Sequence, residues 1–354
     1  MNRFFASHSP LRIFGFSGIL SLFVVGSVLF ALGIDAAIIT LILIAIEIAF
    51  SFDNAIINAK TLGKLSQTWQ KVFLTVGMVI AVVGMRVVFP ILIVSLSAHL
   101  SWSQVVNLAL HHPHSYAEKL DLAHPTIAAF GGAFLLMLAL EFFVDDTRTV
   151  VWLRYIERPL QRIAKIWVPA VLSVVTVLLI SLIPANHHAR TTLVAGLLGI
   201  VTHIAIELCT NLFGASQHNK KIGKGGLTGV AAFTTFVYLE VLDASFSFDG
   251  VIGAFAVTSK VILIAAGLGV GALWVRSLTV FMVRKGTLKD YIYLEHGAHY
   301  TVIVLAFVLL LSIFLEIPDV LAGLVGVGFI GSSIVASRQA LAQRKKIANP
   351  GFRA

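Results

Sequence analysis

Long apolar runs separated by short polar segments extend over nearly the whole chain. A helix needs about 20 apolar residues to cross a hydrocarbon core of about 30 Å. Ten runs approach or exceed this length, at roughly 14–33, 34–58, 72–97, 126–144, 168–184, 191–213, 228–257, 261–283, 300–316 and 319–337. The pattern predicts an all-α fold, a polytopic membrane helical bundle with nine or ten transmembrane helices.

The first run is open to a second interpretation. It follows Arg3 and Arg12, as the apolar region of a signal peptide would, but Ala31-Leu32-Gly33 is a poor cleavage site. We therefore expect this run to be retained as a span.

Composition agrees with a membrane protein. Of the 354 residues, 58% are hydrophobic and only 12% are charged, which is more apolar surface than one soluble core could bury. We expect a single integral membrane domain over residues 1–354. The one cysteine, Cys209, excludes a disulfide within the chain and a thiolate metal site.

The net charge of +9 would suit nucleic-acid binding or membrane orientation, and the positions of the charges decide between them. With a cytoplasmic N-terminus, 21 of the 26 Lys and Arg residues fall on the cytoplasmic side, and only Lys119, Arg190 and Lys260 fall outside. Cytoplasmic loops are enriched in Lys and Arg. We therefore predict that both termini are cytoplasmic, that the basic tail 338–354 lies along the inner leaflet, and that nucleic acid is not a partner.

One motif occurs twice within the apolar runs. Phe-Ser-Phe-Asp ends at Asp53 and again at Asp249, and a second acid lies six residues before each of these aspartates, Glu47 in the first copy and Asp243 in the second. An ionised carboxylate in hydrocarbon costs roughly 3 kcal/mol or more unless it is paired, solvated or metal-bound. The repeated acids therefore indicate function.

The repeat also predicts a topology. The two motif helices are five spans apart, so they cross the membrane in opposite directions. We interpret residues 34–184 and 191–337 as two inverted halves. Inverted repeats with polar residues near the midplane are a recurrent plan of secondary transporters.

Helical geometry places most of the polar motif residues on one stripe in each copy. At about 100° per residue, the stripes are Glu47, Ser51, Asn54 and Asn58 in the first copy, and Glu240, Asp243, Ser247 and Gly250 in the second. Asp53 and Asp249 project away from these stripes. Ser, Asn and Gly tolerate broken helix, so we hypothesise a local break that lets all the oxygens converge.

Carboxylates, hydroxyls and amides without thiolates suit a hard divalent cation. Mn²⁺, Mg²⁺ and Ca²⁺ all fit such oxygen ligands, and we expect no organic cofactor. Two arginines inside the spans, Arg86 and Arg276, lend themselves to two interpretations. They either pair with the acids for assembly, or act as counter-ions or gating groups for the cation site.

Two further clusters stay open. Glu141 ends a span beside Asp145 and Asp146, and it either joins a proton relay or simply faces the membrane interface. His203 and Glu207, four residues apart on one helical face, suit a proton relay, extra metal ligands or an interhelical hydrogen bond. The stretch 98–125, which we expect to be an external loop, carries five histidines and is either a solvated polar loop or a metal-sampling segment.

The motifs resemble those of the TerC-like integral membrane proteins. The likeness rests on the paired acids, on Gly131-Gly132-Ala133-Phe134 and on Glu295-His296-Gly297-Ala298-His299, and extends over about 34 to 335. Within that family, the chain most resembles the branch known as a domain of unknown function. The wider family is grouped with LysE-type exporters. The resemblance implies a bacterial inner-membrane protein, manganese export and tellurium resistance. It also implies metal binding at Glu47, Asp53, Asp243 and Asp249.

Other function classes are less favoured. The chain has no His-Glu-x-x-His zinc motif and no phosphate-binding G-x-x-x-x-G-K-[ST] loop, and its Phe-Asp pairs differ from the Tyr-Asp and Gly-x-Gly-Asp of intramembrane proteases. We expect a non-enzymatic Mn²⁺ exporter. The alternatives are an assembly or metal-delivery partner, and a tellurium-resistance factor without direct transport. A membrane protein partner or a homo-oligomer is compatible with each.

Overall fold

The computed structural model describes residues 10–218, 226–258 and 260–348. Within these ranges the chain is helical, and its one β feature is an isolated bridge between Leu65 and Leu227. The chain begins with α1 (Pro10–Leu32), α2 (Ile34–Phe50), α3 (Phe52–Leu62), α4 (Gln67–Val79), the π-helix η1 (Ile80–Val88), α5 (Phe89–Ser97), α6 (Trp102–His111) and α7 (Pro113–Val144). It continues with α8 (Arg154–Arg162), α9 (Val168–Ser181), α10 (Ala189–His218), α11 (Gly229–Val257), α12 (Val261–Lys285), α13 (Thr287–Asp290), α14 (Leu294–Ser312) and α15 (Asp319–Ala348).

The helices confirm a multi-pass membrane bundle. Eight helices in the described ranges are long and apolar enough to cross a membrane, and α2 with α3 would form a ninth, bent span. The span predicted at roughly 168–184 is corrected in length. It forms α9, whose 14 residues extend only about 21 Å at 1.5 Å per residue.

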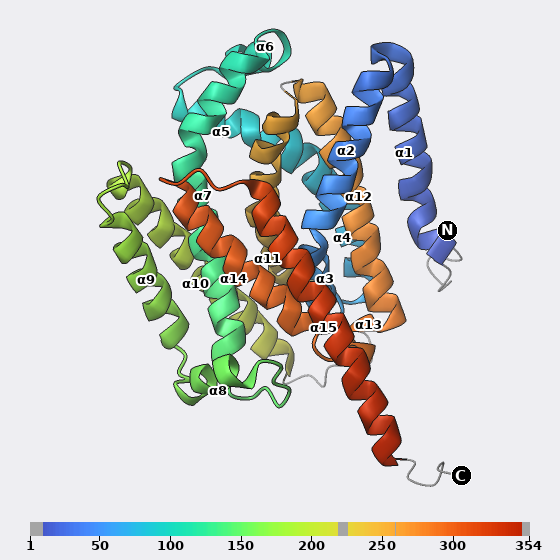
Figure 1. The fold of residues 1–354 in the computed structure, drawn as a ribbon, viewed down its shortest axis with the longest axis vertical. Coiled ribbons are helices and arrows are strands. Elements are labelled where there is room, and N and C mark those ends of the chain that lie inside the picture. Colours follow the sequence, from blue (N-terminus) through green and yellow to red (C-terminus); the bar gives the residue numbers. More distant parts are fainter. Residues whose placement is uncertain (1–9, 219–225, 259, 349–354) are drawn as a thin grey trace.

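The α7 helix lies at the centre of the bundle, where α10 packs on one side and α14 on another (Figure 1). Its apolar residues Phe134, Leu135 and Leu136 are fully buried. A Cβ added at Gly132 would lie 3.0 Å from the Ala306 carbonyl oxygen of α14, so the absence of a side chain lets the two helices approach closely.

The predicted external loop 98–125 is wrong as a loop. The stretch folds into α6 and the first turns of α7. Ser101 and Gln104 form a capping box that starts α6, and Pro113 occupies the first turn of α7, where its missing N–H costs nothing. Capping chemistry thus overrides the polar composition from which a loop was expected.

The hypothesised break is confirmed in the first motif copy and wrong in the second. The axis bends by 53° between α2 and α3. Ser51, at the junction, has φ −99° and ψ 17°, although the flanking hydrogen bonds from Ser51 N–H to Glu47 and from Ala55 N–H to Ser51 persist. The second copy lies within the uninterrupted helix α11.

The bundle has two chemically different ends. Figure 1 shows α8, α13 and the C-terminal end of α15 at one end, which we call the α8 end. The α1–α2 turn and α6 lie at the opposite end, which we call the α6 end. The basic helix α8 and the Arg284-Lys285 end of α12 belong to the α8 end, as the predicted orientation requires. Which side of the membrane each end faces stays a prediction.

Candidate functional site

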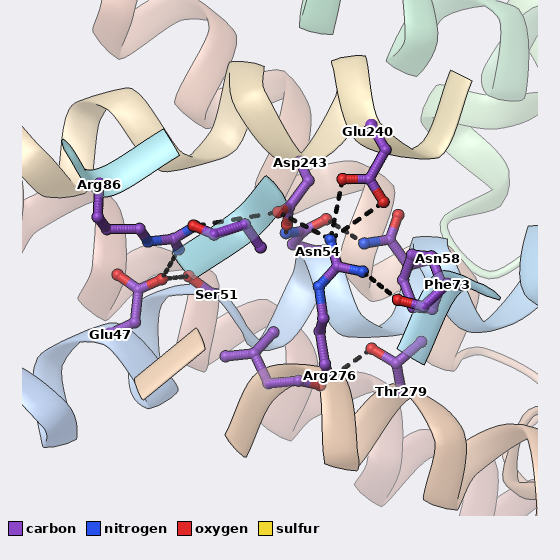
Figure 2. Close-up of polar contacts among 12 residues, drawn as sticks. Glu47, Ser51, Asn54, Asn58, Phe73, Arg86, Glu240, Asp243, Arg276 and Thr279 are labelled. Atoms are coloured by element: carbon purple, nitrogen blue, oxygen red, sulfur yellow. Dashed lines mark hydrogen bonds and ion pairs between the residues drawn. The ribbon is translucent and has the colours of Figure 1, made fainter. Parts of the chain in front are cut away.

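The two motif copies meet inside the bundle. The Asn54 Nδ2 of α3 donates a 2.7 Å hydrogen bond to Asp243 Oδ1 of α11, and Asn58 Nδ2 donates one of 2.9 Å to Asn54 Oδ1 (Figure 2). All three side chains are buried. Residues 189 positions apart in the chain are therefore joined by a direct polar contact, and the sequence-predicted stripes face each other.

Arg86 binds the first copy from the π-helix. Its Nη2 forms a short ion pair with Glu47 Oε1, and its Nη1 donates a 2.7 Å hydrogen bond to the Ala81 carbonyl and lies 4.0 Å from Asp243 Oδ2. Both members of the Arg86–Glu47 pair are buried. π-helical turns are rare and concentrate at functional sites, and here one carries a buried guanidinium into contact with both motif copies.

Arg276 of α12 binds the second copy. Its Nη2 lies 3.2 Å from both Glu240 carboxylate oxygens and 3.4 Å from Asp243 Oδ2 (Figure 2). Its Nη1 donates a 2.8 Å hydrogen bond to the Phe73 carbonyl, and its guanidinium carbon stands 4.2 Å from the centre of the Phe73 ring. Asp243 is thus shared between the two arginines.

Charge does not balance among the buried groups. The buried side chains in this region include two guanidiniums, those of Arg86 and Arg276, and four carboxylates, those of Glu47, Asp53, Glu240 and Asp243. If all are ionised, two negative charges lack a cationic partner in this set. Uncompensated charge is costly in a low-dielectric interior. Two protons or one divalent cation would restore neutrality.

A cavity of about 420 Å³ adjoins this cluster. Glu47, Ser51 and Asp53 line it from the α2–α3 junction, and Gly250 lines it from α11. A Cβ added at Gly250 would lie 3.3 Å from Glu47 Oε2, so glycine keeps room beside that carboxylate. The bend at Ser51 therefore brings carboxylates and a hydroxyl from both sides of the break to one space.

Asp53 is the most exceptional member of the cavity wall. Its side chain is buried, and its Oδ2 has no hydrogen-bond partner within the described structure. It occupies the first turn of α3, where the positive end of the helix dipole favours an anion. The placement is that of an available oxygen ligand.

The cavity extends toward the α6 end. Val257 at the end of α11 and Ile317-Pro318 in the α14–α15 connection line its far part. Its remaining wall is mostly apolar and comes from α2, α11, α14 and α15, including Thr301, Gly323, Gly326 and Val327. Polar groups are therefore concentrated at the inner end of an otherwise apolar chamber.

The other predicted site residues have different positions. Ser51 Oγ lies 3.4 Å from Glu47 Oε1, whereas Asn54, Glu240 and Asp243 belong to the ion network and do not line the cavity. Ser247 is buried on α11, also away from the cavity wall. The backbone of Asp249 lies in α11, but its side chain falls outside the described side chains, so its predicted ligand role stays a prediction.

A second ion cluster, which the sequence did not predict, lies at the α8 end of α3. Lys60 forms a short ion pair with Glu295 of α14, and Arg148 Nη1 lies 3.2 Å from the same Glu295 Oε1. Arg148 Nε lies 3.3 Å from Asp145, and the guanidinium stacks 3.4 Å from the Phe142 ring centre. The hint in the sequence was Glu295 itself, an acid at a span edge. We call Lys60, Arg148 and Glu295 the inner ion cluster.

A neighbouring contact anchors α8. The Glu157 carboxylate accepts hydrogen bonds from the N–H groups of Trp152 and Leu153 at 3.1 and 3.0 Å and from the Tyr300 hydroxyl at 3.2 Å. His296 Nε2 lies 3.4 Å away. Burial raises the pKa of Glu157, but the hydrogen bonds from His296 and the two N–H groups outweigh it and bring the pKa below its usual value.

The predicted cluster of Glu141, His203 and Glu207 also forms. His203 Nε2 lies 2.9 Å from Glu141 Oε2, and one ligand atom from each of the three residues lies within 4.8 Å of the others. In the described part of the chain, no other group of three or more His, Cys, Asp or Glu side chains meets this criterion. The histidines of the 98–125 stretch are not part of such a group.

Comparison with known proteins gives one match. Residues 52–345 match the family described as Protein of unknown function (DUF475). The chain belongs to this family. No curated protein and no solved structure matches it. The matched range includes Asp53, Asp243 and both buried arginines, while Glu47 lies just before it. The likeness to TerC-like proteins and LysE-type exporters stays a prediction.

Proposed function

We propose that this chain transports a divalent metal cation, with Mn²⁺ as the first candidate, through the cavity between its two motif helices. One observation carries the proposal: Glu47 and Asp53 line a cavity, and together with Glu240 and Asp243 of the adjoining network they make four buried carboxylates against two buried guanidiniums. A divalent cation has the matching charge, and carboxylate and hydroxyl oxygens are the ligands that Mn²⁺, Mg²⁺ and Ca²⁺ accept.

The arginines would serve as internal counter-ions. Arg86 neutralises Glu47, and Arg276 neutralises Glu240 and Asp243, which keeps the acids tolerable inside the bundle without a cation. A cation arriving at Glu47 and Asp53 would compete with Arg86 for the Glu47 carboxylate. Binding would thereby loosen the contact that holds η1 to α2, which couples occupancy to helix position.

The cavity supports access from one end at a time. It extends from the acids toward the α6 end, whereas the inner ion cluster joins α3, α14 and the segment after α7 at the opposite end. Opening of the acids to one end of the bundle and then to the other is the basis of alternating access. Proton binding to the carboxylates on release of the cation would supply a coupling ion.

Reconstitution into proteoliposomes tests the proposal. We expect the wild type to quench a Mn²⁺-sensitive dye trapped inside the vesicles, and Asp53→Asn to lower the initial rate at least tenfold, on the order of the loss that follows damage to a metal site. Glu118→Gln is the matched control, because it removes an exposed carboxylate on α7 and should keep the wild-type rate.

Two results would overturn the proposal. Equal rates for wild type and Asp53→Asn would remove the cavity from the transport path. Failure of wild-type protein to move Mn²⁺, Mg²⁺ or Ca²⁺ would reject cation transport and favour the assembly or metal-delivery alternative. Size-exclusion profiles of each variant establish that the reconstituted proteins are folded.

A further inference from the structure

We propose that Glu141, His203 and Glu207 form a second metal site, separate from the motif cavity, that takes a first-row transition cation such as Zn²⁺. The site lies where α7 and α10 pack together. It does not depend on the proposed transport function, because none of its residues lines the cavity or touches the two buried arginines.

The local structure explains why the three side chains converge. His203 and Glu207 are one helical turn apart on α10, so they project from the same face. Glu141 reaches them from α7, three residues before that helix ends. The ligand atoms lie within 4.8 Å of one another, close enough for small movements to bring all three onto one cation.

His203 supplies the nitrogen ligand of the cluster. Its side chain is 1% exposed, and its Nε2 lies 2.9 Å from Glu141 Oε2. Nε2 is therefore the ring nitrogen placed to bind a cation beside the carboxylates. A neutral imidazole nitrogen is a common ligand of divalent transition cations.

The surroundings hold the imidazole in place and leave a way in. The Phe134 ring contacts His203 edge-on at 4.9 Å, and Tyr238 of α11 stands at 6.4 Å. The Glu141 side chain is 27% exposed and Glu207 is partly exposed, so the carboxylates lie on the open side of the cluster. An ion can therefore reach the two carboxylates first and then bind the buried His203 nitrogen behind them.

The donor set selects the class of ion. One imidazole nitrogen and two carboxylates favour Zn²⁺, Co²⁺, Fe²⁺ or Mn²⁺ over Mg²⁺ and Ca²⁺, which prefer oxygen-only sites. Three protein ligands leave coordination positions for water, as in exchangeable zinc sites. The motif cavity offers only oxygen ligands. A comparison of Zn²⁺ with Mg²⁺ binding should therefore distinguish the second site from the motif cavity.

Zn²⁺ titration of the purified full-length chain by calorimetry tests the assignment. We expect Asp53→Asn to retain a Zn²⁺ event that Glu207→Gln weakens at least tenfold and His203→Gln abolishes, with the stoichiometry falling by one ion per chain. Glu118→Gln on α7 is the matched control and should titrate like the wild type. Excess Mg²⁺ should leave this event unchanged.

The design separates failure of this site from failure of the protein. Glu207 is partly exposed, so its variant should fold even if the buried His203→Gln variant does not, and thermal melts without metal verify both. Wild-type Zn²⁺ binding in Glu207→Gln and in Glu141→Gln would overturn the second site. Mn²⁺ flux by the same variants in proteoliposomes reports on the cavity independently.

Discussion

The two motif copies share Phe-Ser-Phe-Asp but differ in backbone. The first copy bends by 53° at Ser51 and turns Asp53 to the cavity wall, whereas the second lies within the uninterrupted helix α11. Identical local sequence therefore does not decide the break. The neighbours decide it: Arg86 from the π-helix holds Glu47 before the bend, and Asp243 of α11 holds Asn54 after it.

This inequality is informative about mechanism. Inverted halves that alternate in shape must differ from each other in any one state. The bent copy lines the cavity through Glu47, Ser51 and Asp53, while the unbroken copy places Glu240 and Asp243 on Arg276. In the proposed cycle, the first copy thus binds the cation, and the second copy holds carboxylates that are paired with an arginine.

Removal of each arginine tests this division, and we expect it to lower the free energy of unfolding more than any other substitution described below. Arg276→Met leaves Glu240 and Asp243 without their main cation, and loss of one partner from a buried ion pair costs roughly 3–5 kcal/mol in free energy of unfolding. Arg86→Met leaves chiefly Glu47 unpaired, so we expect a smaller loss. Unfolding of both variants in detergent measures the difference.

A second substitution serves as the control for that experiment. Adding Glu240→Gln to Arg276→Met removes one of the two stranded charges and should recover part of the lost stability. If Arg86→Met proves the more damaging of the single variants, or if neither changes stability, the charges are not divided between the copies as described.

Loss of the hydrogen bond between the two copies should lower the free energy of unfolding by less than loss of either arginine. Asn54→Ala removes the hydrogen bond to the Asp243 carboxylate, and a hydrogen bond to a charged group contributes about 1.5–3 kcal/mol. Asn58→Ala removes only a hydrogen bond to a neutral amide, worth about 0.5–1.5 kcal/mol. Thermal unfolding of the pair gives the comparison, and equal losses would show that the bridge to α11 has no special weight.

The smallest change in stability should come from Glu157, which contacts neither motif copy. Because the pKa of Glu157 is lowered by folding, its ionised form stabilises the protein above the ordinary value of 4.5, and that stabilisation is lost as pH falls through the folded-state pKa. We expect the melting temperatures of wild type and Glu157→Gln to differ most at pH 7 and to converge below pH of about 4.5.

That titration has its own control. Glu118→Gln changes an exposed carboxylate on α7 and should follow the wild type at every pH. A constant gap between wild type and Glu157→Gln across the titration would mean that the glutamate stabilises α8 by packing alone. In either case, the pH response of α8 is separated from that of the motif copies.

Much of this architecture follows from the sequence because hydropathy and spacing are local. The apolar runs predicted the bundle, the repeated acids predicted the cluster, and two lone arginines in apolar runs were natural partners for them. The prediction for 98–125 was wrong, because it was based on the polarity of the histidines and did not consider the capping box that starts α6.

Other features could not be predicted because they depend on tertiary contacts. Lys60 and Glu295 are 235 residues apart, and nothing local to either indicates the pairing. The absence of a break in α11 likewise depends on its neighbours rather than on its motif. The hydrogen-bond register of η1 leaves no mark in composition, so the π-helix around Arg86 was also missed.

That register has a consequence for the whole span from Gln67 to Leu96. In η1 an N–H reaches five residues back, as that of Phe89 does to the Gly84 carbonyl, whereas an α-helix reaches four. The added residue shifts the phase of the following helix, so α5 turns toward α6 and α7 while α4 faces α11. Loss of one residue between Ile80 and Val88 would leave the hydropathy profile nearly intact. It would nevertheless rotate one half of the span against the other and point Arg86 away from Glu47.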